Sequence, residues 1–113
     1  MSAIDAEIAG QLAADLPVED FVRILRTFER DLLRLSHDLD QAVAIRSLEQ
    51  YRRTAHSLAG AAAAVGAKRL EKVARIAMDA TSATDPREVA AAIQLEAKAA
   101  LAELAALADD PPG

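Results

Sequence analysis

The 113-residue chain is predicted to fold as an all-α protein, an up-down antiparallel four-helix bundle preceded by a short N-terminal lead helix. Helix-favouring Ala, Leu, Arg and Glu dominate, whereas only 3% of the residues are aromatic and glycine and proline occur four times each. Apolar residues recur at spacings of three and four, the period of a helix with one buried face. The connections between these periodic segments are short, which makes successive helices antiparallel neighbours.

The first two helices are predicted from apolar spacing and one proline. Ile4, Ile8 and Leu12 form the apolar edge of a short lead helix that ends before Pro17. Pro17 suits the first turn of a new helix, because its missing N–H would have no partner there. The stripe that follows predicts a helix of roughly 25 residues. It consists of Val18, Phe21, Leu25, Phe28, Leu32, Leu35 and Leu39.

The next helix is predicted to begin at a capping box and to end at a glycine. Ser47 and Gln50 stand at the spacing of a capping box, and Gly66 supplies the break. The inward stripe of this helix is predicted to consist of Leu48, Tyr51, Ala55, Leu58, Ala62 and Val65.

Two further helices complete the predicted bundle. The third long helix turns Leu70, Val73, Ala74 and Ala77 inward, and a turn follows at 81–84. Asp85, Pro86 and Glu88 then supply an N-cap, a first-turn proline and an acidic residue at the third position. The last helix turns Ile93, Ala97, Ala100, Leu104 and Leu107 inward. Residues 1–108 are predicted to form one domain, and 109–113 a disordered acidic, proline-containing tail.

Charge is distributed unevenly along the chain, whose net charge is −5. Residues 17–108 balance 13 acidic against 13 basic residues, so the excess acidity lies at the two ends. Residues 46–75 carry seven basic and two acidic residues, a local charge of +5 around His56. Such a segment suits an anionic partner or a phosphoryl group, or it simply forms solvated helix faces. The scarcity of aromatic residues and the overall acidity argue against a nucleic-acid partner.

Several classes of function are disfavoured by what the sequence lacks. There is no cysteine, so no disulfide or thiolate metal site can form. No apolar run reaches the length of a membrane span and no signal peptide is evident, so we expect a cytoplasmic protein without a membrane partner. A metal site joining His37 and His56 with Asp38 or Asp40 lacks the usual ligand spacing, and none is predicted. Without a glycine-rich phosphate loop, ATP binding is not expected.

His56 is predicted to lie at the edge of the core, within reach of solvent. With about 100° between successive residues, the stripe beside the inward face of its helix reads Arg52, His56, Ala59 and Ala63, with Gly60 next to it. Apart from Arg52 and His56, this stripe bears only methyl groups or less. A partner could therefore approach the imidazole closely, and the stripe could also serve as a self-association seam.

The residues around His56 resemble the histidine phosphotransfer (HPt) domain of two-component phosphorelays. Ala55-His56-Ser57-Leu58-Ala59-Gly60, followed by Gly66 and Leu70, matches the family pattern of His-x-Leu-Lys-Gly with a later Gly and Leu. The resemblance covers most of the chain, including the lead helix and the histidine on the second long helix. The departure from the pattern is Ala59, which stands where the family has lysine.

The resemblance implies that His56 accepts a phosphoryl group from a receiver-domain aspartate or a histidine kinase and passes it to a response regulator. The chain would be a stoichiometric phosphocarrier, not an enzyme, and a monomer. Its partners would be receiver domains or a hybrid histidine kinase. It would hold no cofactor, with Mg²⁺ supplied by the partner receiver domain. The residues expected to bind phosphate or receiver are Gly60, Arg52, Arg53, Ala59, Ala63, Lys72 and Arg75.

Ala59 leaves an alternative open. In the family, the lysine is expected to neutralise the phosphoryl group and to contact the receiver, and Ala59 can do neither. Arg52, Arg53, Lys72 or Arg75 could take over this role. The alternative is a non-catalytic adaptor or inhibitor that binds a receiver or kinase without carrying phosphate.

Overall fold

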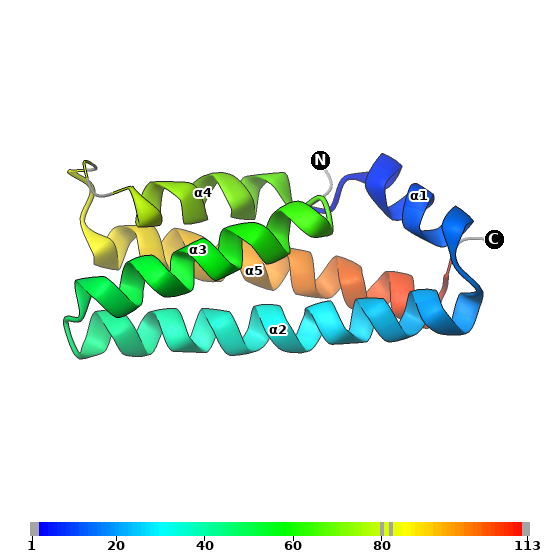
Figure 1. Ribbon diagram of the computed structural model, residues 1–113, viewed down its shortest axis with the longest axis horizontal. Coiled ribbons are helices and arrows are strands. Elements are labelled where there is room, and N and C mark those ends of the chain that lie inside the picture. The colour runs from blue at the N-terminus through cyan, green and yellow to red at the C-terminus, as the bar shows by residue number, and fades with distance from the viewer. Residues whose placement is uncertain (1–2, 80, 82, 112–113) are drawn as a thin grey trace.

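The predicted all-α class is confirmed by the structure, a computed structural model that describes residues 3–79, 81 and 83–111. Within this part of the chain there are five helices and no strand. Figure 1 shows the four longer helices side by side, with the short first helix near one end of the group. The elements are α1 (Ala6–Asp15), α2 (Val18–Ala44), α3 (Leu48–Ala64), α4 (Lys68–Met78) and α5 (Pro86–Asp109).

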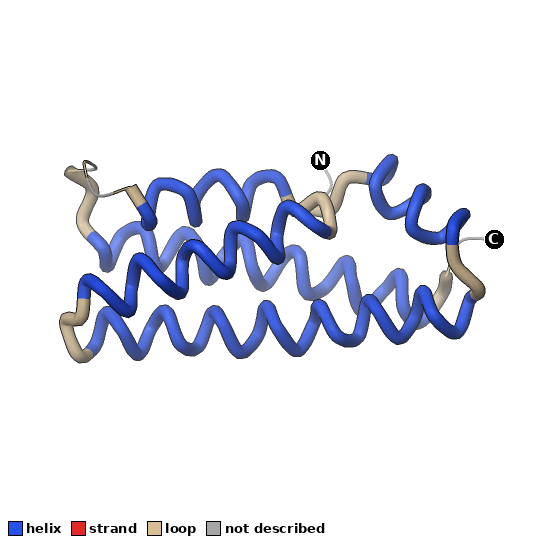
Figure 2. Tube along the Cα trace, viewed as in Figure 1, coloured by secondary structure: helices blue, strands red, loops and turns tan. Residues whose placement is uncertain are grey.

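The four longer helices share one core. α2 packs against α3 and α5, and α4 packs against the same two helices. Short connections join successive helices (Figure 2). No helix in the described residues is long and apolar enough to cross a membrane. The largest fully buried side chains come from all four helices and from the C-cap of α3, and are Phe21, Leu25, Leu32, Leu39, Leu58, Val65, Leu70, Ile93 and Leu104.

The predicted inward stripes are confirmed along most of their length, but they are wrong at two helix starts. Val18 is 57% exposed and Leu48 is 53% exposed. Each is the first residue of its helix, so it lies at an end of the core, where fewer neighbours cover it. Helical spacing predicts the direction of a side chain, whereas burial also requires a neighbouring element at the same height.

Both predicted N-caps form, although the capping box at α3 is only half made. The Ser47 hydroxyl accepts the backbone N–H of Gln50 at 3.2 Å. The Ser47 N–H is instead donated to the carbonyl of Ala42, at 3.0 Å, so Gln50 has no N–H left to bind there. The Asp85 carboxylate accepts the backbone N–H of Arg87 at 3.0 Å, as expected for the start of α5.

α3 ends in a Schellman turn centred on Gly66. Gly66 has a φ of 74° and donates its N–H to the carbonyl of Ala63, while Ala67 donates to Ala62 at 2.8 Å. These two bonds satisfy carbonyls that the end of the helix would otherwise leave without partners. The predicted break at Gly66 is confirmed, and Figure 1 shows the chain reversing there between α3 and α4.

The N-terminal segment rests on this turn, a contact that the sequence did not indicate. Asp5 donates its N–H to the carbonyl of Gly66 at 2.8 Å, and its carboxylate lies 2.7 Å from the Lys68 ammonium. The hydrogen-bonded Lys68 ammonium holds the pKa of Asp5 below its usual value. The Glu103 carboxylate of α5 accepts the backbone N–H groups of Ala3 and Ile4. Residues 3–5 therefore join the α3–α4 turn to α5.

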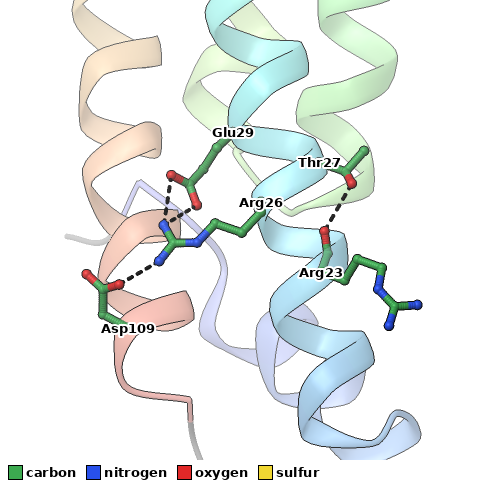
Figure 3. Close-up of polar contacts among 5 residues, drawn as sticks. All are labelled: Arg23, Arg26, Thr27, Glu29 and Asp109. Carbon is green, nitrogen blue, oxygen red and sulfur yellow. Dashed lines mark hydrogen bonds and ion pairs between the residues drawn. The ribbon is translucent and has the colours of Figure 1, made fainter.

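The far end of α5 is tied to α2 by an arginine. Arg26 Nη1 lies 2.9 Å from Glu29 Oε1, and Arg26 Nη2 lies 2.6 Å from Asp109 Oδ1 (Figure 3). Asp109, predicted to begin a disordered tail, is instead the last residue of α5. Residues 112–113 of that tail and Ser82 of the predicted 81–84 turn lie outside the described residues.

Replacing Gly66 should destabilise the protein, because a Cβ there would lie 2.9 Å from the Asp5 Cβ on a left-handed backbone. We expect Gly66→Ala to lower the free energy of unfolding by about 1–3 kcal/mol in urea titrations. Gly60→Ala is the matched control, since no atom lies within 4 Å of its added methyl group. It should raise the free energy of unfolding by about 0.5–1 kcal/mol through helix propensity. Equal effects of the two substitutions would contradict this account.

Candidate functional site

His56 lies in the middle of α3 with its side chain exposed to solvent. Tyr51, Ala55, Leu58 and Ala62 on the same helix are buried and face the core. His56 follows Ala55, so its side chain points about 100° away from that core face. Within the described part of the chain, no hydrogen bond or ion pair engages the imidazole. Both ring nitrogens are therefore available to a partner.

The surface next to His56 is formed by very small residues. Ser57, Gly60, Ala63 and Ala64 are all exposed, and together with His56 they form what we call the His56 strip. A Cβ placed at Gly60, one turn after His56, would meet no atom within 4 Å. The strip therefore leaves space beside the imidazole on its C-terminal side, and a partner's backbone could approach it closely.

Ala59 does not belong to this surface, which corrects the predicted grouping of positions 52, 56, 59 and 63. Ala59 is only 3% exposed and belongs to the core. It lies one turn after Ala55 and about 40° further around the helix, at the edge of the core face, where a neighbouring helix can cover it. Ala59 therefore contributes almost no accessible surface beside His56.

Two of the four predicted cations form ion pairs with glutamates, and two do not. Arg53 pairs with Glu49 on α3, and Arg75 donates to Glu71 on α4 from Nε at 2.9 Å and from Nη2 at 2.7 Å. Arg52 is half-buried and Lys72 is exposed, and in the described part of the chain no acidic side chain pairs with either of them. Of these four cations, Arg52 and Lys72 are thus the ones that no described acidic side chain neutralises.

Arg75 lies on the side of α4 that faces α3. Arg69 marks the opposite flank, because its Nε lies 2.9 Å from Glu96 Oε2 on α5. Glu71 and Arg75 are displaced from Arg69 around the helix toward the side next to α3. Arg52 lies on α3 one turn before His56, where side chains four residues apart are neighbours. Arg52 and Arg75 are therefore directed toward the surface shared by α3 and α4, whereas Arg53 lies on the α2 side of α3, beside Asp38 and Gln41.

A metal-dependent site is not found. The described residues contain no group of three or more His, Asp or Glu side chains that could hold a metal ion. His37, the second histidine, is exposed on α2, a different helix from that of His56. What His56 offers is an exposed imidazole on a packed helix, and a neutral imidazole nitrogen is a nucleophile.

The Hpt domain family model matches residues 23–109, which include all of α3, α4 and α5. The chain belongs to the Hpt domain family, whose members take part in histidine phosphotransfer in phosphorelays. No curated protein and no solved structure matches the chain.

The burial of Ala59 beside the exposed Ala63 can be tested by stability measurements on a matched pair of substitutions. Ala59→Leu should lower the free energy of unfolding by about 1–3 kcal/mol, because the added atoms have no space in the core. Ala63→Leu should change it by less than about 0.5 kcal/mol, because the site is exposed. Denaturant titration followed by circular dichroism measures both. Similar losses at the two positions would show that the strip is covered as well.

Proposed function

We propose that this protein carries a phosphoryl group on His56, taking it from a receiver-domain aspartate or a histidine kinase and delivering it to a response regulator. The observation that carries the proposal is the exposed, unpartnered His56 beside Gly60 and Ala63 in a chain of the Hpt domain family. We further propose that α2 to α5 form an up-down antiparallel four-helix bundle, which holds the histidine rigidly on its outer surface.

The chemistry asks little of the carrier beyond an accessible nucleophile. The unprotonated ring nitrogen of His56 attacks the phosphorus of the phosphoaspartate, and the N–P bond forms as the P–O bond breaks. The bonding electron pair leaves with the aspartate carboxylate, and the other imidazole nitrogen keeps its hydrogen. Such transfers depend mainly on in-line positioning and charge stabilisation. The space above Gly60 supports the close approach that this geometry needs.

Charge compensation at the phosphoryl group is assigned to Arg52, in place of the family lysine. Ala59 bears no charge and is buried, whereas Arg52 lies one turn before His56 without an acidic partner in the described residues. Arg53 is less suited because Glu49 already neutralises it. Lys72 on α4 supplies a second unpaired cation and adds to the positive local field.

The remaining parts of the reaction are assigned to the partner. A receiver domain would bring the phosphoaspartate and its Mg²⁺. The protein itself would carry one phosphoryl group per molecule, as a monomer, and would hold no cofactor. We place this exchange in the cytoplasm, where receiver domains and the catalytic parts of histidine kinases meet. The small side chains of the His56 strip suit docking of such a partner.

Phosphoryl uptake should depend on one of the two histidines. Incubation with a panel of receiver domains carrying radiolabelled phosphate should place acid-labile, alkali-stable label on the wild-type protein and on His37→Gln. His56→Gln should take up none, while its circular dichroism spectrum remains helical. Label on His56→Gln would contradict the assignment. Measurable receiver binding without label on the wild type would instead identify an adaptor.

The proposed role of Arg52 gives a second matched pair. Arg52→Gln should slow phosphoryl uptake roughly 5–10-fold, the effect of losing about 1 kcal/mol of charge stabilisation in the transition state. Arg53→Gln should slow it less than about twofold, because Glu49 already compensates that charge. Single-turnover rates with a phosphorylated receiver measure both. A larger effect at Arg53 would assign the compensating cation to the other residue.

A further inference from the structure

A groove of about 630 Å³ opens where the α2–α3 turn meets the start of α5. Its volume falls within the range of ligand-binding sites. None of the residues assigned to phosphoryl transfer lines it. The lining residues that carry chemistry or apolar surface are Val43, Arg46, Leu48, Tyr51, Asp85 and Arg87.

Tyr51 places a hydrogen-bond donor in this groove. The residue is only 4% exposed, and within the described part of the chain its hydroxyl has no hydrogen-bond partner. That hydroxyl is nevertheless not sealed in the core, because no fully buried side-chain oxygen there is left without a partner. It must therefore open into the groove that Tyr51 lines. Burial, and then the charge of Asp85, raises the pKa of Tyr51, so the phenol keeps its hydrogen and can donate it.

Two arginines give the groove a positive edge. Arg46 and Arg87 are exposed and form no ion pair with the described residues. Arg46 has a φ of 57°, in the left-handed region that costs an ordinary residue conformational energy. Asp85 opposes them, but its carboxylate already accepts the Arg87 backbone N–H at 3.0 Å. An incoming carboxylate would therefore find two cations against one engaged acid.

The surface beside the groove is apolar and extends beyond what a small molecule would cover. Ile45 is 60% exposed and Leu48 is 53% exposed, and both lie on the α2–α3 turn or next to it. Burying both would remove a substantial apolar area from water. Ile45 does not line the groove, so a compact acid in the groove would leave it exposed, whereas a polypeptide crossing the turn would cover Ile45 as well as Leu48.

We propose that this groove binds a segment of a partner protein in which acidic side chains alternate with bulky aliphatic ones. A carboxylate of the segment accepts a hydrogen bond from the Tyr51 hydroxyl and forms ion pairs with Arg46 and Arg87. The aliphatic side chains of the segment cover Ile45 and Leu48. The site is distinct from the His56 strip, so it would let the carrier hold one protein while His56 exchanges phosphate with another.

The protein contains a built-in reporter for this site, because Tyr51 is its single tyrosine and it has no tryptophan. The probe is the peptide acetyl-Gly-Leu-Asp-Leu-Asp-Gly-amide, which lacks both chromophores. Titrating it into the 113-residue protein should give a saturable change in the Tyr51 fluorescence. The same peptide with Asn for Asp should bind at least about tenfold more weakly. No saturable change, or equal binding of both peptides, would overturn the proposal.

Variants localise the binding and separate it from phosphoryl transfer. Joint substitution of Arg46→Asn and Arg87→Gln should weaken peptide binding about tenfold, and Arg30→Gln on α2 should not. Leu48→Ala should weaken it, whereas Leu33→Ala, at a site 63% exposed on α2, should not. Tyr51→Phe should also bind the peptide more weakly. Because this variant lacks the tyrosine reporter, its binding is measured by calorimetry. Circular dichroism checks that each variant is folded.

Two further arms complete the experiment. His56→Gln should bind the peptide like the wild type, so loss of phosphoryl transfer and loss of peptide binding are separate outcomes. Isovalerate, a carboxylate on a small branched body, should bind much more weakly than the peptide. If isovalerate saturates the Tyr51 signal at the same concentration as the peptide, the site is one for a small acid and the protein-segment assignment is wrong.

Discussion

The left-handed turn at Gly66 is the constraint on which the arrangement around His56 depends. It closes α3 with two backbone hydrogen bonds and sends the chain back as α4 along the flank of α3. The same glycine lets Asp5 approach closely, and Lys68 at the start of α4 then pairs with that residue. One backbone position therefore orients α4, buries the end of α3 and seats the N-terminal segment. A side chain at this position would disturb all three.

The packing that follows divides α3 into a buried half and an open half. Ala55, Leu58, Ala59 and Ala62 are buried, while His56, Gly60 and Ala63 on the other side remain exposed. The imidazole stands on a helix whose opposite face is packed in the core, so the backbone that carries it loses little conformational freedom when a partner docks. The phosphocarrier function proposed for this member of the Hpt domain family requires this combination of rigidity and access.

Features that depend on local sequence were predictable. The caps at Ser47 and Asp85, the break at Gly66 and the exposure of His56 follow from short-range hydrogen bonding and helical spacing. The burial of Ala59 was not predictable, because helical spacing places it between the core and the surface and only the position of the neighbouring helix decides. The pairing of Arg53 and Arg75 with glutamates follows from four-residue spacings in the sequence and could have been predicted.

Contacts between residues far apart in the sequence needed the structure. Nothing local indicates that Asp5 rests on Gly66, or that Arg26 bridges to Asp109. The groove beside Tyr51 also brings residues 85–87 of the α5 start next to residues 42–51, so the placement of its two arginines around the Tyr51 side chain is decided only when the helices pack. Long-range contacts of this kind decide which polar groups are engaged and which are left for partners.

The most direct measurement of the central claim is a complete relay in one mixture. A receiver domain carrying radiolabelled phosphate, this protein and a second, unlabelled receiver domain are combined, and the label on all three is followed with time. The account predicts that label appears transiently on this protein and then on the second receiver, and that His56→Gln abolishes both steps. Delivery to the second receiver at an unchanged rate with His56→Gln would contradict the account.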